Sequence, residues 1–316
     1  MTSPATIHRL VAALGAEDHL AWEAKQRKSA AIAAGLAGVL SAAGMAWRAI
    51  TLNDGPSPGL LEALGRLQDP GPPIGSQRSL ALPFFQHYQD NAVPIVAAVV
   101  MVALGSVALG WALTYLAVAT RARRPEFPKI LLYLPVVAGI LNGIYVIASE
   151  VSRLLDYDHV LSGPGTVDAV LDLGVNGFAI FAAIVGLPGT LGLALALVFV
   201  SLNAMRVGLL TRFMGVLGMI TGALMVIQLP ALLIVQFFWL IWLAFLIAGR
   251  WPGGVPPAWR TGKAEPWPSN REAAASRREA AAAKRREAPE PAAEPQPVPA
   301  GRAHPSSKKR KRKRRD

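Results

Sequence analysis

Polar side chains recur at helical spacing at the ends of two apolar segments, where they could bind an ion or a small ligand. The first set follows the +3, +4, +4 spacing of one helix face and consists of Asn142, Tyr145, Ser149 and Arg153. The second set recurs every four residues and consists of Asp168, Asp172 and Asn176. Glu150 lies close to both in sequence. If the two faces meet, they form an acid-rich vestibule in which Arg153 pairs with Asp168 or Asp172.

Three interpretations of this vestibule stay open. Most of its acids lie at or beyond the expected membrane boundary, where helix capping and solvated loops use such residues. A structural salt bridge is the second interpretation. The third is an ion or small-ligand site, because polar residues inside a membrane are often functional.

No motif for covalent or cofactor chemistry is present. The sequence lacks a P-loop, a G-x-G-x-x-G nucleotide motif, an H-E-x-x-H zinc motif and a G-x-S-x-G nucleophile motif. It also has no cysteine, which excludes disulfides and thiolate chemistry. Residues 156–159 combine histidine with two acids, but their spacing is not diagnostic of a metal site, and a polar loop is favoured. We therefore expect no enzymatic activity, no cofactor and no metal.

The composition is that of a membrane protein. Hydrophobic residues make up 53% of the 316 residues and charged residues only 16%, against about 25% charged in globular proteins. Long uncharged stretches predict six transmembrane helices, at 29–48, 93–119, 130–150, 177–202, 208–227 and 231–249. The last two share one uncharged stretch, which is too long for one crossing and contains Gln228-Leu229-Pro230 near its middle. The predicted fold class is all-α, a polytopic transmembrane helical bundle.

Basic residues alternate between the connecting segments and predict the orientation. The segments before the first span, between the second and third, between the fourth and fifth, and after the sixth are basic, whereas the others are acidic or poor in charge. The positive-inside rule then places both termini in the cytoplasm of a multi-pass cell-membrane protein. The 28 residues before the first span exceed the charged region of a signal peptide, which favours a retained span over a cleaved one.

Three domains are expected along the chain. Residues 1–28 form a cytoplasmic segment with an amphipathic helix at the membrane surface. Residues 29–249 form the membrane domain, whose long loop at 49–92 between the first and second spans holds a short helix at 58–68 and an aromatic stretch at 82–88 suited to the membrane interface. Residues 250–316 form a disordered basic cytoplasmic tail, irregular at its start and with a solvated helix after residue 269.

The tail carries almost all of the net charge. It contains 18 Lys and Arg against 7 Asp and Glu, which gives +11 of the total +12. It includes eight consecutive bases: Lys308, Lys309, Arg310, Lys311, Arg312, Lys313, Arg314 and Arg315. The simplest interpretation is a solvated charge run that helps to fix topology. Anionic lipid head groups are the nearest ligand, and RNA or the ribosome is a weaker one, because no aromatic residues interleave to stack bases.

Two glycine motifs lie within the predicted spans. Gly186-Leu187-Pro188-Gly189 is expected to kink its helix, although a break of this kind can also mark a transporter site. Gly218 and Gly222 have the spacing that lets helices approach closely, and packing inside the bundle is favoured over dimerisation.

Two stretches resemble uncharacterised multi-pass bacterial integral membrane proteins. Residues 206–218 resemble a cytoplasmic hairpin of that family, and residues 249–254, with Pro257-Ala258-Trp259 and 266–269 after them, are similar to the same proteins. The resemblance covers residues 200–269. It implies a membrane location and topology, and it implies no activity and no site residues.

Two functions are compatible with these features. The first is a non-enzymatic integral membrane protein, with the lipid bilayer as its partner, whose polybasic tail contacts anionic lipid or a cytoplasmic partner. The alternative is a small-solute or ion transporter or channel that uses the vestibule. The sequence predicts no oligomeric state.

Overall fold

A computed structural model describes residues 16–57, 60–68, 71–227, 232–252 and 254–265, with the isolated residues 267, 275, 278 and 279. Within these residues the chain is helical and forms no strand, and its one extended pairing is an isolated bridge between Arg78 and Thr166. The chain divides into two compact units, Met1–Trp267 and Pro268–Asp316. All helices described below belong to the first unit. The predicted all-α class is confirmed.

Four helices are long and apolar enough to cross a membrane. They are α2 (Ala16–Asn53), α5 (Ala92–Arg123), α6 (Ile130–Ser162) and α8 (Gly177–Arg206). They contain 38, 32, 33 and 30 residues, so each is at least about 45 Å long at 1.5 Å per residue. This length exceeds the hydrocarbon core of a bilayer, about 30 Å. The structure therefore supports the membrane class that the composition predicted.

Two shorter apolar helices coincide with the predicted fifth and sixth spans. α9 (Arg212–Ile227) and α10 (Leu232–Ile247) contain 16 residues each, or about 24 Å. α9 starts later than the predicted residue 208, because Gly208 has a positive φ of 82° and the Thr211 hydroxyl accepts a hydrogen bond from the Met214 amide. The predicted turn at 228–230 lies outside the described residues.

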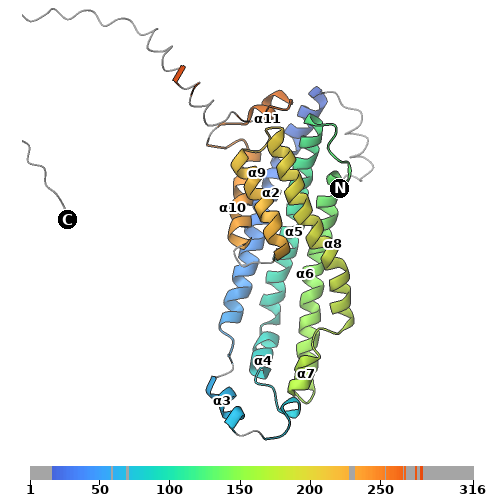
Figure 1. Ribbon diagram of the computed structural model, residues 1–316, viewed down its shortest axis with the longest axis vertical. Helices are drawn as coiled ribbons and strands as arrows, with labels where there is room; N and C mark the ends of the chain where they lie inside the picture. The colour runs from blue at the N-terminus through green and yellow to red at the C-terminus, as the bar shows by residue number, and fades with distance from the viewer. Residues whose placement is uncertain are drawn as a thin grey trace, which may run out of the picture. The chain divides into compact units, whose positions relative to one another are not determined.

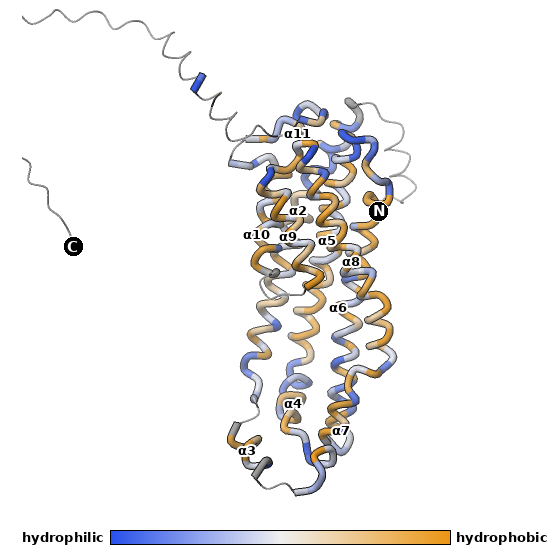
Figure 2. Tube along the Cα trace, in the orientation of Figure 1, coloured by the Kyte–Doolittle hydropathy of each residue, from blue (hydrophilic) through white to orange (hydrophobic). Residues whose placement is uncertain are grey.

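The six apolar helices form a ring in which each packs against its neighbours in chain order, and α10 returns to α2. Figure 1 shows α9 and α10 beside one half of the long helices, at the end that carries α11 (Pro257–Thr261). We call this end the α11 end. The opposite end carries α4 (Leu82–Asp90) and is called the α4 end. In Figure 2 the middle of the bundle is mainly hydrophobic, and hydrophilic residues gather toward both ends.

Glycines allow the close approach of the helices. A Cβ atom at Gly110 would lie 2.5 Å from the Pro135 carbonyl oxygen, and one at Gly222 would lie 2.6 Å from the Ala194 carbonyl oxygen. Gly218 faces Ser201 of α8. The prediction that Gly218 and Gly222 pack inside the bundle is thus confirmed. α8 continues through Pro188 without a break, so its glycine–proline motif does not divide the helix.

Short helices gather at the α4 end. α3 (Leu60–Gln68), the 3-10 turn η1 (Ile74–Ser76) and α4 lie in the long connection between α2 and α5, and α7 (Val167–Leu171) lies between α6 and α8. α4 packs on the end of α6, where the rings of Phe85 and Tyr157 stack at 4.2 Å. The predicted aromatic stretch is thus a helix with buried aromatic rings.

Two predicted boundaries need correction, and a third falls inside a helix. The predicted start of the first span at residue 29 lies within α2, which runs continuously from Ala16 to Asn53. The predicted loop at 156–159 is part of α6, which continues to Ser162. The disorder predicted from residue 250 does not apply to residues 254–265, because α11 forms there and buries Trp259.

Candidate functional site

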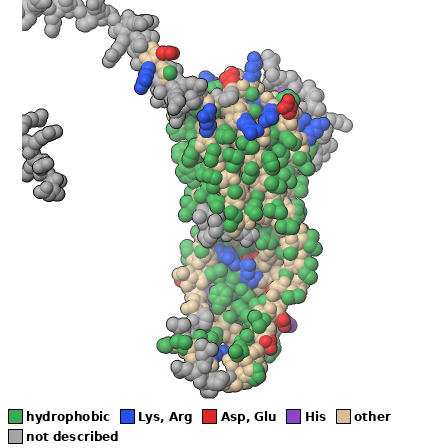
Figure 3. All heavy atoms as spheres, in the orientation of Figure 1, with side chains coloured by type: hydrophobic (Ala, Val, Ile, Leu, Met, Phe, Trp, Pro, Cys, Tyr) green, Lys and Arg blue, Asp and Glu red, His purple; other side chains and the backbone are tan. Residues whose placement is uncertain are grey.

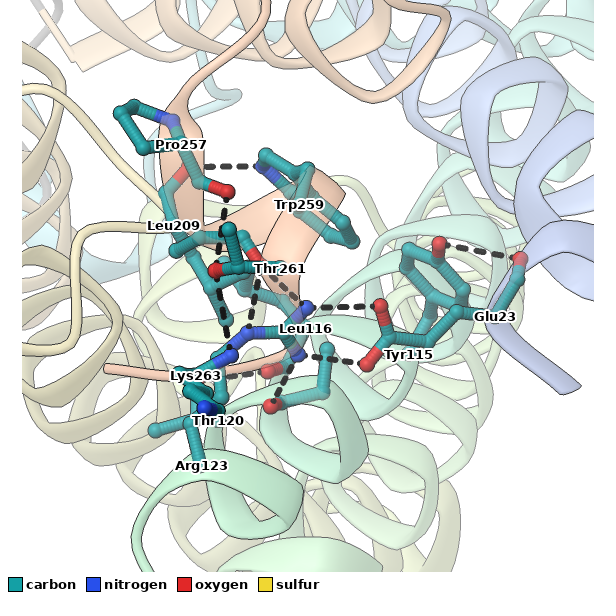
Figure 4. Close-up of polar contacts among 12 residues, drawn as sticks. Glu23, Tyr115, Leu116, Thr120, Arg123, Leu209, Pro257, Trp259, Thr261 and Lys263 are labelled. Carbon is teal, nitrogen blue, oxygen red and sulfur yellow. Dashed lines mark hydrogen bonds and ion pairs between the residues drawn. The ribbon is translucent and has the colours of Figure 1, made fainter. Parts of the chain in front are cut away.

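A buried ion pair joins α2 to α5 at the α11 end. Arg123 donates from Nη1 to Glu23 Oε1 at 2.5 Å and from Nη2 to Glu23 Oε2 at 2.9 Å. The side chains are 0% and 6% exposed. Arg123 also donates to the Ala258 carbonyl, from Nη2 at 2.8 Å and from Nε at 3.1 Å, and to the Ala119 carbonyl at 2.8 Å. The guanidinium of Arg123 thus forms hydrogen bonds with α2, with α5 and with α11 (Figure 4).

Trp259 completes this arrangement, which we call the α11 cluster: Glu23, Tyr115, Arg123, Ala258 and Trp259. The Trp259 indole nitrogen donates to the Leu209 carbonyl at 3.0 Å. Its ring stacks on Tyr115 with centroids 5.9 Å apart, and the Arg123 guanidinium lies 5.4 Å from the indole centroid. Beyond α11, the Glu265 amide donates to the Val207 carbonyl at 3.1 Å. The segment after α10 is therefore docked onto the end of the helix ring.

A second charged cluster lies toward the α4 end and consists of Arg48, Tyr88, Glu150 and Arg153. Arg153 Nη1 lies 2.7 Å from Glu150 Oε2, and Arg48 Nη2 lies 3.6 Å from the same oxygen. The Tyr88 hydroxyl donates to Glu150 Oε1 and accepts from Arg48 at 2.9 Å and from Arg153 at 3.3 Å. Three helices, α2, α4 and α6, therefore meet at one carboxylate, and we call the four residues the Glu150 cluster.

The Glu150 cluster has an excess positive charge. The Glu150 side chain is only 4% exposed, whereas Arg48 and Arg153 are 32% and 38% exposed. Burial raises the pKa of the Tyr88 phenol, and the hydrogen bond to Glu150 raises it further, although the bond to Arg153 lowers it. Tyr88 is therefore neutral at physiological pH and serves as a donor to the carboxylate. Two guanidinium groups against one carboxylate leave a net charge of about +1.

The predicted vestibule is divided among separate places. Asn142 is buried between helices, where it donates to Ser106 at 2.9 Å and accepts from Thr190 at 3.1 Å. Asn176 caps α8 by accepting from the Ala179 amide at 2.9 Å, and its amide donates to Asp156 at 2.7 Å. Both contacts are of the capping and structural kind.

The remaining vestibule residues do not join these groups. Arg153 pairs with Glu150, so the predicted pairing with Asp168 or Asp172 is wrong. Asp168 lies in the first turn of α7 beside Gly75, and Asp172 is the C-terminal cap residue of that helix. Tyr145 packs against Gly186 of α8, and Ser149 is partly buried next to Glu150 in sequence. Of the eight predicted residues, the structure thus brings Glu150 and Arg153 together in a charged site.

The polyanion-binding residues Lys308 to Arg315 lie outside the described residues. In the part of the chain that the structure describes, no group of three or more His, Cys, Asp or Glu side chains could hold a metal ion.

Arg48, Tyr88, Glu23, Arg123 and Trp259 were not identified as site residues from sequence. A signal for Arg48 was present, because Arg48 and Glu150 end two uncharged stretches that begin after Lys28 and Lys129. The two stretches contain 19 and 20 residues, and these nearly equal lengths place Arg48 and Glu150 at a similar level of their spans. No comparable pattern marked Glu23, which lies among basic residues.

Comparisons with protein-family models, with curated proteins and with solved structures find no match to this chain.

Proposed function

We propose that this is a non-enzymatic integral membrane protein that presents a polybasic cytoplasmic tail to anionic lipid. The observation that carries the proposal is the docking of α11 by Arg123, Glu23 and Trp259. This docking fixes the chain through Glu265 to the end of the bundle, 43 residues before the first of the eight consecutive bases, Lys308. A bare linker after α10 would not need a buried ion pair and a buried tryptophan.

The distribution of basic residues supports the proposed orientation. Figure 3 shows Lys and Arg side chains gathered at the α11 end of the first unit. They come from four segments, including 25–28, 121–129 and 206–212. By the positive-inside rule this end faces the cytoplasm, with both termini on that side and six crossings of the cell membrane. α9 and α10 are the last two crossings, which their short length allows if the bilayer thins locally.

Eight consecutive bases are sufficient to bind an anionic membrane surface. Each Lys or Arg near an anionic surface contributes up to about 1 kcal/mol, and the attraction falls with salt. The bases at 308–315 are therefore the part of the chain that would contact anionic lipid.

Vesicle capture by the full-length protein tests this function. The protein is placed in nanodiscs of zwitterionic lipid and mixed with vesicles that contain phosphatidylglycerol. A tail-neutral variant, in which all eight bases from Lys308 to Arg315 are replaced by Gln, is the comparison. We expect the parent to co-sediment with these vesicles at low salt, and the variant and high salt each to abolish capture.

Equal capture by the parent and the tail-neutral variant would reject the proposal. Capture of RNA in preference to vesicles would reject lipid as the ligand. Arg66→Gln serves as the control, because it removes a base on α3 at the α4 end and should leave vesicle capture unchanged.

Transport of a small solute or ion is supported less well. A transporter would use polar groups along one path, but Asn142 is bonded between Ser106 and Thr190, and Asp168 and Asp172 lie with α7. The separation of these residues therefore makes transport the weaker proposal.

A further inference from the structure

The Glu150 cluster lies at the level of a membrane boundary. On α2, Arg48 is about 32 Å from Arg27 at 1.5 Å per residue, and on α6, Glu150 is the same distance from Lys129. No charged residue lies between Lys28 and Arg48 or between Lys129 and Glu150. Because the hydrocarbon core is about 30 Å thick, the cluster falls at the depth of lipid phosphates in the leaflet at the α4 end.

The excess positive charge of the cluster favours the binding of an anion. Arg48 and Arg153 share one carboxylate, and the buried Nε of Arg48 has no hydrogen-bond partner among the described residues. The nearby Asp156 is already used, since it accepts from the Asn176 amide at 2.7 Å and the Gly174 backbone amide at 3.0 Å. An uncompensated cation at the edge of a low-dielectric region is costly, and an anionic ligand offsets that cost.

The two arginines can be reached from outside. Each is about one-third exposed, and Figure 3 shows basic side chains in a hollow of the face below α9 and α10. Since α10 packs on α2 and α9 packs on α8, the space between α2 and α8 beyond the end of this hairpin holds neither helix.

Apolar side chains of α2 and α8 are exposed at the same level as the cluster. Met45 and Trp47 of α2 and Phe178 and Phe181 of α8 are exposed. A soluble anion would gain nothing from these side chains, whereas acyl chains would cover them. Basic side chains together with exposed apolar side chains at the membrane boundary fit an amphiphile with an anionic head group.

We propose that the Glu150 cluster binds an anionic phospholipid of the leaflet at the α4 end. The lipid phosphate lies between Arg48 and Arg153, whose planar guanidinium groups suit bidentate phosphate contacts, and its acyl chains cover the exposed faces of α2 and α8. Glu150 limits the net positive charge that the two arginines present to the phosphate. This site is independent of the tail and of the function proposed above.

Lipid titration of the full-length tail-neutral protein tests the site. The detergent-solubilised protein is titrated with phosphatidylglycerol or phosphatidylcholine, and bound lipid is counted by native mass spectrometry. We expect tighter binding of phosphatidylglycerol, weakened about fivefold or more by Arg48→Gln and by Arg153→Gln. Arg66→Gln is the matched control, because Arg66 pairs with Glu62 on α3, and this variant should bind like the parent.

Glu150→Gln keeps the proposal testable if an arginine variant fails to fold. It preserves the shape of the side chain and removes the negative charge, so phosphatidylglycerol should bind more tightly, an effect that a folding defect would not produce. The proposal is overturned if Glu150→Gln leaves binding unchanged or weaker, or if both arginine variants bind like the parent. It is also overturned if inorganic phosphate competes fully, since the ligand would then be a free anion.

Discussion

Two ion pairs of this protein differ in the burial of their charges. The pair of Glu23 and Arg123 is almost fully buried, and its carboxylate accepts two hydrogen bonds from the guanidinium. The pair of Glu62 and Arg66 is exposed on α3, with 3.4 Å between its atoms. Breaking a buried pair leaves a charge without compensation, whereas an exposed pair contributes little.

Removing one partner of the buried pair should destabilise the protein strongly. We expect Glu23→Gln to lower the free energy of unfolding by about 3 kcal/mol or more, because Arg123 stays buried with its charge only partly compensated. Equilibrium unfolding in mixed micelles measures the change. The double variant Glu23→Gln with Arg123→Met should recover part of the loss, since no charge remains.

Glu62→Gln is the control for this measurement and should cost less than about 1 kcal/mol. A loss as large as that of Glu23→Gln would show that the burial of the pair is not what determines its contribution.

For individual residues, the sequence identified some polar residues of the site but few of their contacts. Glu150 and Arg153 were recognised as polar residues near a span end, and they do meet. Their partners Arg48 and Tyr88 are 40 residues apart in sequence and lie on different helices, so no helical spacing could connect them. Asp168 and Asp172 followed the same spacing but lie on α7, because Gly174 has a positive φ of 85° and interrupts the chain before α8.

Among the elements, the helices are held together by glycines at points where backbones nearly touch. The Cβ atom of an alanine at position 110 would lie 2.5 Å from the Pro135 carbonyl oxygen, and this backbone atom cannot rotate away. At position 65 of α3, an added Cβ would meet no atom within 4 Å. The two glycines thus differ in the space around them.

Gly110→Ala should therefore destabilise the bundle, because α5 and α6 must move apart. The expected cost is about 1–3 kcal/mol, typical of overpacking, and the thermal midpoint of the detergent-solubilised protein measures it. Gly65→Ala should cause no loss, since alanine favours a helix where space permits. Equal losses in both variants would contradict the close approach of α5 and α6.

Elements were predicted well at their centres and poorly at their ends. Apolar content locates the six apolar helices, because desolvation of the side chains depends on composition alone. It does not report the additional turns of α6 after Glu150, where packing on Phe85 sustains the helix. It also missed α11, whose Trp259 gains its burial from α5 and from the backbone of Leu209.

For the whole molecule, the proposed topology makes a labelling prediction. The chain has no cysteine, so single cysteines can report sidedness. A membrane-impermeant maleimide on intact cells should label Ser162→Cys, which is exposed near the end of α6, and should label Lys263→Cys only after permeabilisation. Labelling of Lys263→Cys in intact cells would reverse the proposed orientation.

The same assay decides whether α9 and α10 cross the membrane. A cysteine in place of Gln228, which follows the last residue of α9, should be labelled in intact cells if the hairpin reaches the opposite surface. Absence of labelling before and after permeabilisation would mean that the hairpin ends inside the bilayer and would reduce the crossings to four.

The docking of α11 has a consequence for the order of events during synthesis. Arg123 leaves the ribosome long before Ala258, yet its guanidinium donates two hydrogen bonds to the Ala258 carbonyl. Contacts between such distant parts of a chain form late. Until translation has passed residue 258, the nascent bundle therefore has an incompletely bonded arginine and an uncovered Tyr115 at its α11 end. Proteases and chaperones could recognise unfinished chains by this end, and α11 would conceal it once synthesis is complete.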